Sequence, residues 1–181
     1  MASIFNNLYT SKHGVAESTL IKATKVGHQY NLVNTSVDID NGSVCKIGDV
    51  HKEGTARVAD LFEAVVPAKG DKICLILSVP KIYEEYTTKM QEESNFYNAK
   101  GETMRGYEIE ATDRFTLSKE AFKDDAVLEV GKYVFVDGTG FKLNAGEKPV
   151  MTEYGFVAHI YDIAPNGNYR VFVDKNEQIW A

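Results

Sequence analysis

The chain has 181 residues, enough for one compact domain with extensions, and its 44% apolar and 25% charged residues are those of an ordinary soluble protein. A chain of this length buries roughly 70% of its unfolded surface, so it needs no metal or disulfide to fold. The net charge of −6 argues against a nucleic-acid-binding protein, which would show a basic face.

Residues 1–30 are the least regular part of the chain. They lack the basic and apolar segments of a signal peptide, and no later run is long enough to span a membrane, so we expect synthesis and assembly in a cytoplasm. They show neither helical nor strand periodicity, which leaves two interpretations: an extended arm that docks onto a neighbour, or a first strand on the protein's own core. The apolar residues of this segment are Ile4, Phe5, Leu8 and Tyr9.

The next part of the chain alternates short apolar runs with turn signals. Residues 38–42 (DIDNG) predict a turn, because Asn-Gly is a strong turn signal between strands. Residues 43–47 predict a strand that Gly48 and Asp49 end. Residues 55–66 combine helical spacing of apolar residues with a β-rich run that stops at a proline, and we predict a strand.

The middle of the chain joins an apolar run to a polar excursion. Residues 72–79 are almost continuously apolar and predict a strand buried on both faces. In residues 81–100, apolar side chains recur every four positions, so a short helix and a long loop with one helical turn fit equally well. Long loops in compact domains are usually functional.

The last third reads as short strands separated by turns. Strands are predicted over residues 106–110, 114–117, 132–136, 141–143, 156–163 and 169–173, with a short helix capped by Ser118 and running to about Lys123. Turn signals every ten or so residues are typical of a β-barrel or β-sandwich. We therefore predict a mainly β fold: an arm or first strand over residues 1–30, and a single β-rich domain over residues 31–181 with an excursion at 81–104.

No residue pattern predicts catalytic chemistry, a metal or a cofactor. The four histidines form no metal-ligand cluster; His51 is predicted to be an exposed loop residue, and His159 a half-buried, hydrogen-bonded one. Cys45 and Cys74 lie in apolar runs and are predicted to be buried, unpaired side chains.

Two acidic motifs resemble functional loops but fit them poorly. Residues 38–42 lack one residue of the calcium-loop spacing, which favours a plain turn. Asp137-Gly138-Thr139-Gly140 has an extra glycine compared with the aspartic-protease motif and has no second copy, so we predict a tight turn.

The excursion and its flanks supply the best candidates for contacts with a partner. Aromatic side chains are favoured at interfaces, and here they stand among glutamates; they are Tyr83, Tyr86, Phe96 and Tyr97. Arg105 follows and has two interpretations: an ion pair with the excursion or a neighbouring subunit, or a salt bridge within the chain at a strand end. Asp113 and Arg114 carry the same two interpretations.

The order of these segments resembles a group of small virion proteins of tailed bacteriophages, mainly those of Gram-positive hosts, described as head-decoration or minor structural proteins. The resemblance is a spaced pattern of turns and short strands that covers most of the chain. The segments that carry it are Asp40-Asn41-Gly42-Ser43, Ser78-Val79-Pro80 with Tyr83, Phe96-Tyr97-Asn98, Ala99 to Gly101, Arg105-Gly106-Tyr107, Asp113-Arg114-Phe115-Thr116 and Val130 to Phe141.

The resemblance implies a non-enzymatic virion protein that decorates or cements the capsid. Its partner would be the major capsid protein of the same virion, and by analogy with decoration proteins it would be a homo-oligomer, with a trimer expected. Two alternatives stand: a tail-tube or tail-completion protein, and a host-wall carbohydrate-binding β domain. The last needs exposed aromatic side chains on a rigid face, whereas Trp180, the one tryptophan, is expected to pack or to lie at an interface.

Overall fold

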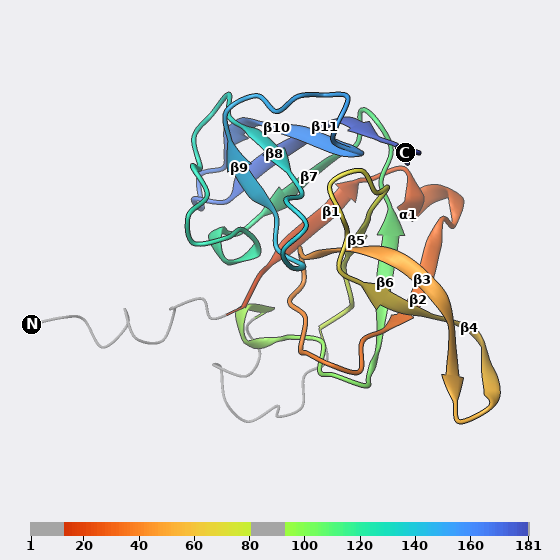
Figure 1. Cartoon of the computed structure of the whole chain (residues 1–181). Coiled ribbons are helices and arrows are strands. Elements are labelled where there is room, and N and C mark those ends of the chain that lie inside the picture. The colour runs from red at the N-terminus through yellow and green to blue at the C-terminus, as the bar shows by residue number, and fades with distance from the viewer. Residues whose placement is uncertain (1–12, 81–92, 181) are drawn as a thin grey trace, which may run out of the picture.

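The computed structural model describes residues 13–80 and 93–180, and in this part of the chain a closed barrel and an open sheet lie side by side (Figure 1). This confirms the predicted mainly β fold with a barrel. The elements in chain order are β1 (Ala16–Leu20), α1 (Ala23–Val26), β2 (Gln29–Val33), β3 (Val44–Glu53), β4 (Ala56–Val65), β5 (Cys74–Ile76), η2 (Glu93–Asn95), β6 (Thr103–Glu108), β7 (Arg114–Leu117), η3 (Lys119–Ala121), β8 (Tyr133–Phe135), β9 (Asn144–Gly146), β10 (Phe156–Ile163) and β11 (Tyr169–Asn176).

The barrel closes five of the described strands in the order β2-β4-β3-β5-β6. β2 runs parallel to β4 and antiparallel to β6, so strands far apart in the chain complete the ring. Its interior is a small apolar core made of Leu32, Ile39, Cys45, Ala64, Cys74, Ile76 and Met104. Both cysteines are buried and unpaired, as the apolar runs around them predict.

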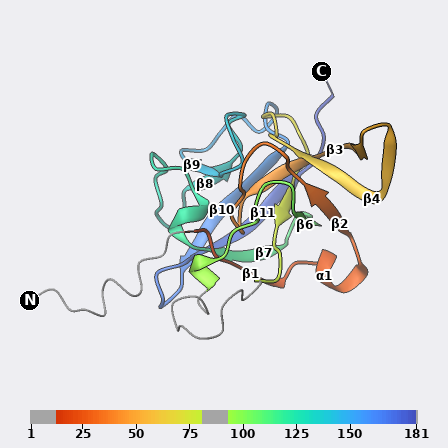
Figure 2. The same ribbon diagram turned by 90° about the horizontal axis from the view of Figure 1, so that it is seen from below.

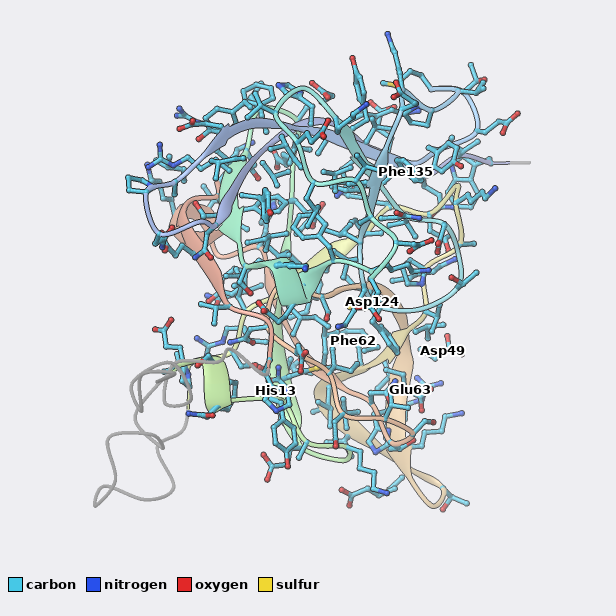
Figure 3. The ribbon with its side chains drawn as sticks, turned by 90° about the vertical axis from the view of Figure 1, so that its left-hand side faces the viewer. His13, Asp49, Phe62, Glu63, Asp124 and Phe135 are labelled. Carbon is cyan, nitrogen blue, oxygen red and sulfur yellow. The ribbon has the colours of Figure 1, made fainter. Side chains whose placement is uncertain are left out.

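The open sheet has the strand order β1-β7-β11-β10-β8-β9, and each neighbouring pair is antiparallel. β1 pairs with β7 at one edge of this sheet. The core beneath the sheet is larger than that of the barrel, and its fully buried residues include Phe122, Leu143, Phe156 and Ile160. Figure 3 shows the two halves from the side, with Phe135 in the sheet and Phe62 in the barrel.

β5 belongs to both cores. Cys74 and Ile76 face the barrel interior, whereas Leu75 between them packs into the core of the sheet. All three side chains are at most 3% exposed. The prediction of a strand buried on both faces is confirmed for the centre of residues 72–79, with Cys74–Ile76 as the strand, whereas Lys72 and Val79 at the ends are exposed.

β4 settles the ambiguous segment 55–66 as a strand. Phe62 and Ala64 contact the barrel core, and their spacing of two residues is that of one strand face. The apolar residues of this segment also have helical spacing, but no helix forms. The backbone groups of β4 form hydrogen bonds with β2 and β3 instead.

The prediction that Gly48 and Asp49 end a strand is wrong, because β3 continues to Glu53. The register between β3 and β4 shifts between Ile47 and Val50. A Cβ on Gly48 would lie 2.7 Å from Cγ2 of Val65, so the glycine permits close strand contact at a bulge. As a result, the β3–β4 hairpin extends beyond the barrel (Figures 1 and 2).

Two smaller predictions in the last third also need correction. The strand expected over residues 141–143 lies three residues later, as β9. Ser118 does not cap η3 with its side chain; its hydroxyl instead accepts a hydrogen bond from the backbone N–H of Val15 (3.0 Å). The serine therefore joins the start of the described chain to β7.

Candidate functional site

Three of the predicted contact residues lie in the described part of the chain: Phe96, Tyr97 and Arg105. The other six lie outside the described residues: Ile4, Phe5, Leu8, Tyr9, Tyr83 and Tyr86. Phe96 is only 8% exposed and packs inward, whereas Tyr97 is 39% exposed and Arg105 is exposed. Among the described residues, Tyr97 and Arg105 are therefore the predicted side chains that a partner reaches without rearrangement of the chain.

Four separated segments meet beside Tyr97, and we call this region the junction (residues 13–15, 38–41, 77–80 and 93–101). Asn41 joins two of them with both ends of its side-chain amide. Its Nδ2 donates to the carbonyl of Ser78 (2.9 Å), and its Oδ1 accepts from the backbone N–H of Ser78 (3.0 Å). Both residues belong to segments that carry the sequence resemblance.

Asn98 adds the third segment. Its Nδ2 donates to the carbonyl of Ile39 (2.9 Å) and to Oδ1 of Asn41 (3.2 Å). The backbones of Ile39 and Asn98 also bond to each other in both directions (2.9 Å each). Asn98 and Asn41 are 5% and 8% exposed, so these amides are internal cross-links.

His13 attaches the beginning of the described chain to the junction (Figure 3). Its backbone N–H donates to the carbonyl of Ser94 (3.1 Å), and its Nδ1 lies 2.8 Å from Oδ1 of Asp40. The imidazole also packs against the ring of Tyr97, with 4.8 Å between centroids. The ring of the exposed Tyr97 therefore packs on an imidazole that Asp40 holds in place.

The aspartates of residues 38–42 also hold the segments of the junction together. Asp40 also accepts from the backbone N–H of Gly14 (3.3 Å), and Asp38 accepts from the backbone N–H of Lys100 (2.8 Å). No group of three or more potential metal ligands occurs within residues 13–80 and 93–180. The carboxylates of residues 38–42 bind backbone amides and an imidazole, and a turn is present at residues 41 and 42, as predicted.

Arg105 lies on β6 beside the junction. Its backbone N–H donates to the hydroxyl of Ser78 (3.0 Å), and its carbonyl accepts from the N–H of Leu77 (2.9 Å). Its guanidinium takes part in no ion pair with another described residue. The backbone of Arg105 is thus fixed by the junction while its side chain is exposed.

Asp113 has a different role from Arg105. It is 5% exposed and accepts hydrogen bonds from the backbone N–H groups of Lys22 (3.0 Å) and Glu110 (2.8 Å). Its carboxylate therefore holds two backbone segments together inside the chain. Of the two interpretations left open for this residue, the internal one describes the structure, although the partners are backbone amides and not a cation.

Described residues of the junction line a small hollow, with a volume of about 150 Å³. Its walls include Gly14, Asn41, Pro80, Glu93 and Tyr107. Pockets that enclose small-molecule ligands usually measure roughly 300–1,000 Å³. This hollow is therefore smaller than a usual ligand pocket, and the hydrogen bonds around it hold segments of the chain in place.

The Asp137 motif forms a turn, as predicted. Asp137 accepts from the backbone N–H of Thr139 (3.0 Å) and pairs with Lys123. Burial alone would raise the pKa of Asp137, but the hydrogen bonds from Lys123 and Thr139 outweigh it and lower the pKa to about 2. A carboxyl that stays ionised in this way stabilises the turn and is a poor general acid.

The two histidines examined from the sequence have different outcomes. His159 is half-buried on β10 and bonded to Asp174 (2.9 Å), which confirms the prediction of a satisfied side chain. The prediction that His51 lies in an exposed loop is wrong. Because β3 continues through the bulge, His51 lies on that strand, with its side chain 15% exposed and 3.5 Å from Glu63.

The cross-links of the junction were not identified from the sequence. His13, Asn41 and Asn98 are polar residues in turn-rich segments, and such residues are usually exposed. The segments that carry the resemblance include Asn41 and Asn98, but the resemblance does not indicate that their side chains join separate segments. Their role depends on contacts between segments 27 to 59 positions apart.

The chain was also compared with known proteins. No helix in the described residues has both the length and the apolar character needed to cross a membrane. No family model, no curated protein and no solved structure matches the chain.

Proposed function

We propose that this chain is a structural protein of a tailed-bacteriophage virion and that it decorates the outer lattice of the head. The observation that carries the proposal is the junction. Segments that resemble the virion proteins at separate places in the sequence are joined there by direct hydrogen bonds among Asn41, Ser78 and Asn98. Three of the resembling segments thus meet at one place in the fold.

The use of polar side chains supports a structural role over an enzymatic one. Asp40 binds His13 and a backbone amide, Asp137 binds Lys123 and its own turn, and Asp174 binds His159. In an active site, such groups converge on a cavity where a substrate can reach them. Here they lie apart, and each has a partner within the chain.

The position of the junction also supports attachment through the nominated segments. Residues 1–12 precede His13, and residues 81–92 join Pro80 to Glu93, so both segments are covalently connected to the junction. Tyr97 and Arg105 are exposed beside these connections. The partner in this proposal is the major capsid protein, with the chain as a homo-oligomer, a trimer by analogy.

Decoration needs only a modest contact at each site. Many copies of a small domain on a symmetric lattice, or several linked copies in one oligomer, bind more strongly than a single contact because later contacts form within an already bound assembly. An exposed tyrosine and an exposed arginine are side chains that interfaces favour.

The first test locates the protein in the particle. Gold-labelled antibody against the chain is applied to purified particles of the source phage and viewed by electron microscopy. We expect label scattered over heads. Label confined to tails would replace decoration with a tail role, and absence of label from particles would remove the virion proposal.

The second test concerns attachment. Particles that lack the chain are incubated with added protein and then heated, and release of DNA is measured. We expect protection by the wild type and weaker protection by the double variant Tyr97→Ala, Arg105→Ala. The control is Tyr161→Ala, which removes a tyrosine of similar exposure (38%) on β10. Equal protection by all three proteins would show that the junction face does not contact the head.

Deletion of residues 1–12 separates attachment from folding. The described core starts after these residues, with β1 paired to β7, so we expect the free protein to unfold at nearly the same temperature. Attachment to heads should weaken. Deletion of residues 1–21 is the contrasting variant, because it also removes β1 and Ile21, which is fully buried. A large loss of stability in the shorter deletion would place residues 1–12 in the core.

A further inference from the structure

A second pocket lies at one end of the barrel, away from the junction. Its volume is about 340 Å³, within the range of ligand pockets, and the mouths of β-barrels are frequent ligand sites. It is bounded by β2, β3, the start of β5, the end of β6 and the segment after β11. Trp180 is among its lining residues and is 86% exposed, so of the two expectations for this tryptophan, packing against the chain is not met and a place at an interface stays a prediction.

The segment that carries Trp180 is held against the barrel end. The backbone N–H of Ile179 donates to the carbonyl of Gly70 (2.8 Å). The side-chain amide of Gln178 donates to Asp71 (3.0 Å) and accepts from the backbone N–H of Lys72 (3.3 Å). The backbone immediately before the tryptophan is therefore held against the barrel end, which places Trp180 at the pocket while its indole stays exposed.

Gly155 makes this close docking possible. A Cβ at Gly155 would lie 2.4 Å from the carbonyl oxygen of Asp71 and 2.6 Å from that of Glu177. The backbone N–H of Glu177 donates to the carbonyl of Gly155 (2.9 Å). Three backbone segments thus meet at Gly155 without an intervening side chain. This contact holds the start of the segment after β11.

The opposite wall of the pocket combines apolar surface with hydrogen-bonding groups. Tyr30 and Ile47 contribute apolar surface, and Tyr30 donates its hydroxyl to Oε2 of Glu108 (3.2 Å). Glu108 also pairs with Lys72 at the pocket wall. Gln178 supplies a side-chain amide on the same side as Trp180.

The charges around the pocket balance. Lys72 pairs with Glu108, and Lys46 pairs with Asp71 (2.7 Å). Burial alone would raise the pKa of Glu108, but the hydrogen bonds from Lys72 and Tyr30 outweigh it and lower the pKa, so the carboxylate stays ionised at neutral pH. Two positive and two negative groups give the pocket no net attraction for a polyanion or a metal cation.

We propose that this pocket binds a neutral glycan, with Trp180 as its stacking platform. A pyranose ring has an apolar face of C–H groups and a rim of hydroxyls, and both parts have matching partners here. The indole of Trp180 receives the apolar face, and Glu108, Lys72 and Gln178 bind hydroxyls. Glu108 and Lys72 already pair with each other and Gln178 bonds to Asp71, so sugar hydroxyls would add to these contacts. A purely apolar ligand would instead strip water from the ionised pair without replacing it, which is costly.

The chain contains a single tryptophan, so its fluorescence reports directly on the proposed site. The full chain is titrated with chitobiose, cellobiose and maltose at millimolar concentrations, and labelled protein is applied to an array of neutral and anionic oligosaccharides. We expect a saturable change in emission with at least one neutral sugar. Saturation-transfer NMR then measures the same binding without relying on the fluorophore.

Two variants test the role of the indole. Trp180→Ala should bind the responding sugar about tenfold more weakly, because it loses the aromatic platform. Trp180→Phe should retain most of the affinity, since an aromatic face remains. Tyr161→Ala is the matched control, because it removes an exposed aromatic side chain on β10 outside the pocket and should bind as the wild type does. Because Trp180 is exposed, we expect all three variants to fold.

Three results would overturn the proposal. They are no binding to any neutral glycan, binding to anionic glycans alone, and equal binding by Trp180→Ala and the wild type. The test uses the isolated protein and needs no virus particle. Its result is therefore independent of the proposed decoration role: glycan binding without attachment to heads, or attachment without glycan binding, separates the two.

Discussion

At the scale of single residues, buried side-chain amides have the largest structural role in the junction. Asn98 donates to Ile39 and Asn41, and all of these groups are shielded from water. Loss of this amide removes two buried hydrogen bonds, although each acceptor keeps one backbone N–H donor, from Asn98 itself and from Ser78.

We expect Asn98→Ala to lower the free energy of unfolding by about 2 kcal/mol, because it removes two buried hydrogen bonds that join separate segments. Urea denaturation followed by circular dichroism measures the change. Asn31→Ala is the matched control, since Asn31 lies exposed on β2 and should change stability by less than about 0.5 kcal/mol. Equal effects of the two substitutions would mean that the amide of Asn98 is not a cross-link.

A second residue-scale prediction concerns pH. The pKa of Asp137 is lowered from 3.8 to about 2 in the folded chain. A carboxyl with a lowered folded pKa stabilises the fold above its unfolded pKa, and this contribution disappears as the pH falls through the folded pKa. We expect Asp137→Asn to be about 1 kcal/mol less stable than the wild type at pH 7, after allowance for solvent screening. The difference should shrink between pH 4 and pH 2 in denaturation curves, and a constant difference over that range would contradict it.

Asp137 also shows how far the sequence is informative about single residues. The glycines around it predict a turn, because they allow backbone conformations that other residues avoid. Its partner Lys123 lies 14 positions away, and no local pattern couples the two. Similarly, apolar neighbours predict that Cys45 and Cys74 are buried, but not that they face each other across β3 and β5.

At the scale of elements, glycines within strands mark close packing. Gly106 belongs to the Arg-Gly-Tyr segment that carries part of the resemblance. In the structure it is buried in β6, opposite Tyr30 of β2. A Cβ on Gly106 would lie 2.4 Å from Cδ1 of Leu32. Leu32 is fully buried in the barrel core and has little space to move.

We expect Gly106→Ala to destabilise the protein by about 1–3 kcal/mol through overpacking of the barrel. The control is Gly140→Ala, because a Cβ at Gly140 meets no described atom within 4 Å and the backbone there is unstrained. Thermal unfolding of both variants measures the difference. A stability for Gly106→Ala equal to that of the control would show that Leu32 moves aside at no cost.

The positions of several strands were predictable because local patterns determine them. β7 and β10 occur at the predicted residues, where apolar side chains and flanking turns define short segments. Pairing was not predictable. β2 lies between β4 and β6, and Asn31 pairs with both Leu61 and Arg105, which are 30 and 74 positions away. Such register depends on how the whole barrel closes, and no window of the sequence contains that information.

At the scale of the whole molecule, the barrel and the sheet are joined through a shared strand. β5 presents Ile76 to the barrel core and Leu75 to the core of the sheet. Loss of β5 would open the barrel and would also remove Leu75 from the core of the sheet. The two assemblies are therefore expected to unfold together, as small cooperative units do.

This coupling gives a test that uses adjacent residues. Leu75 and Ile76 are both fully buried, and replacement of either by alanine should cost about 2–5 kcal/mol. If the cores unfold as one unit, each variant shifts a single calorimetric transition to lower temperature, with equal calorimetric and van't Hoff enthalpies. Val130→Ala, at a position 58% exposed, should leave the transition within about 0.5 kcal/mol of the wild type. If Ile76→Ala instead splits the transition in two while Leu75→Ala does not, the barrel unfolds on its own and β5 does not couple the two cores.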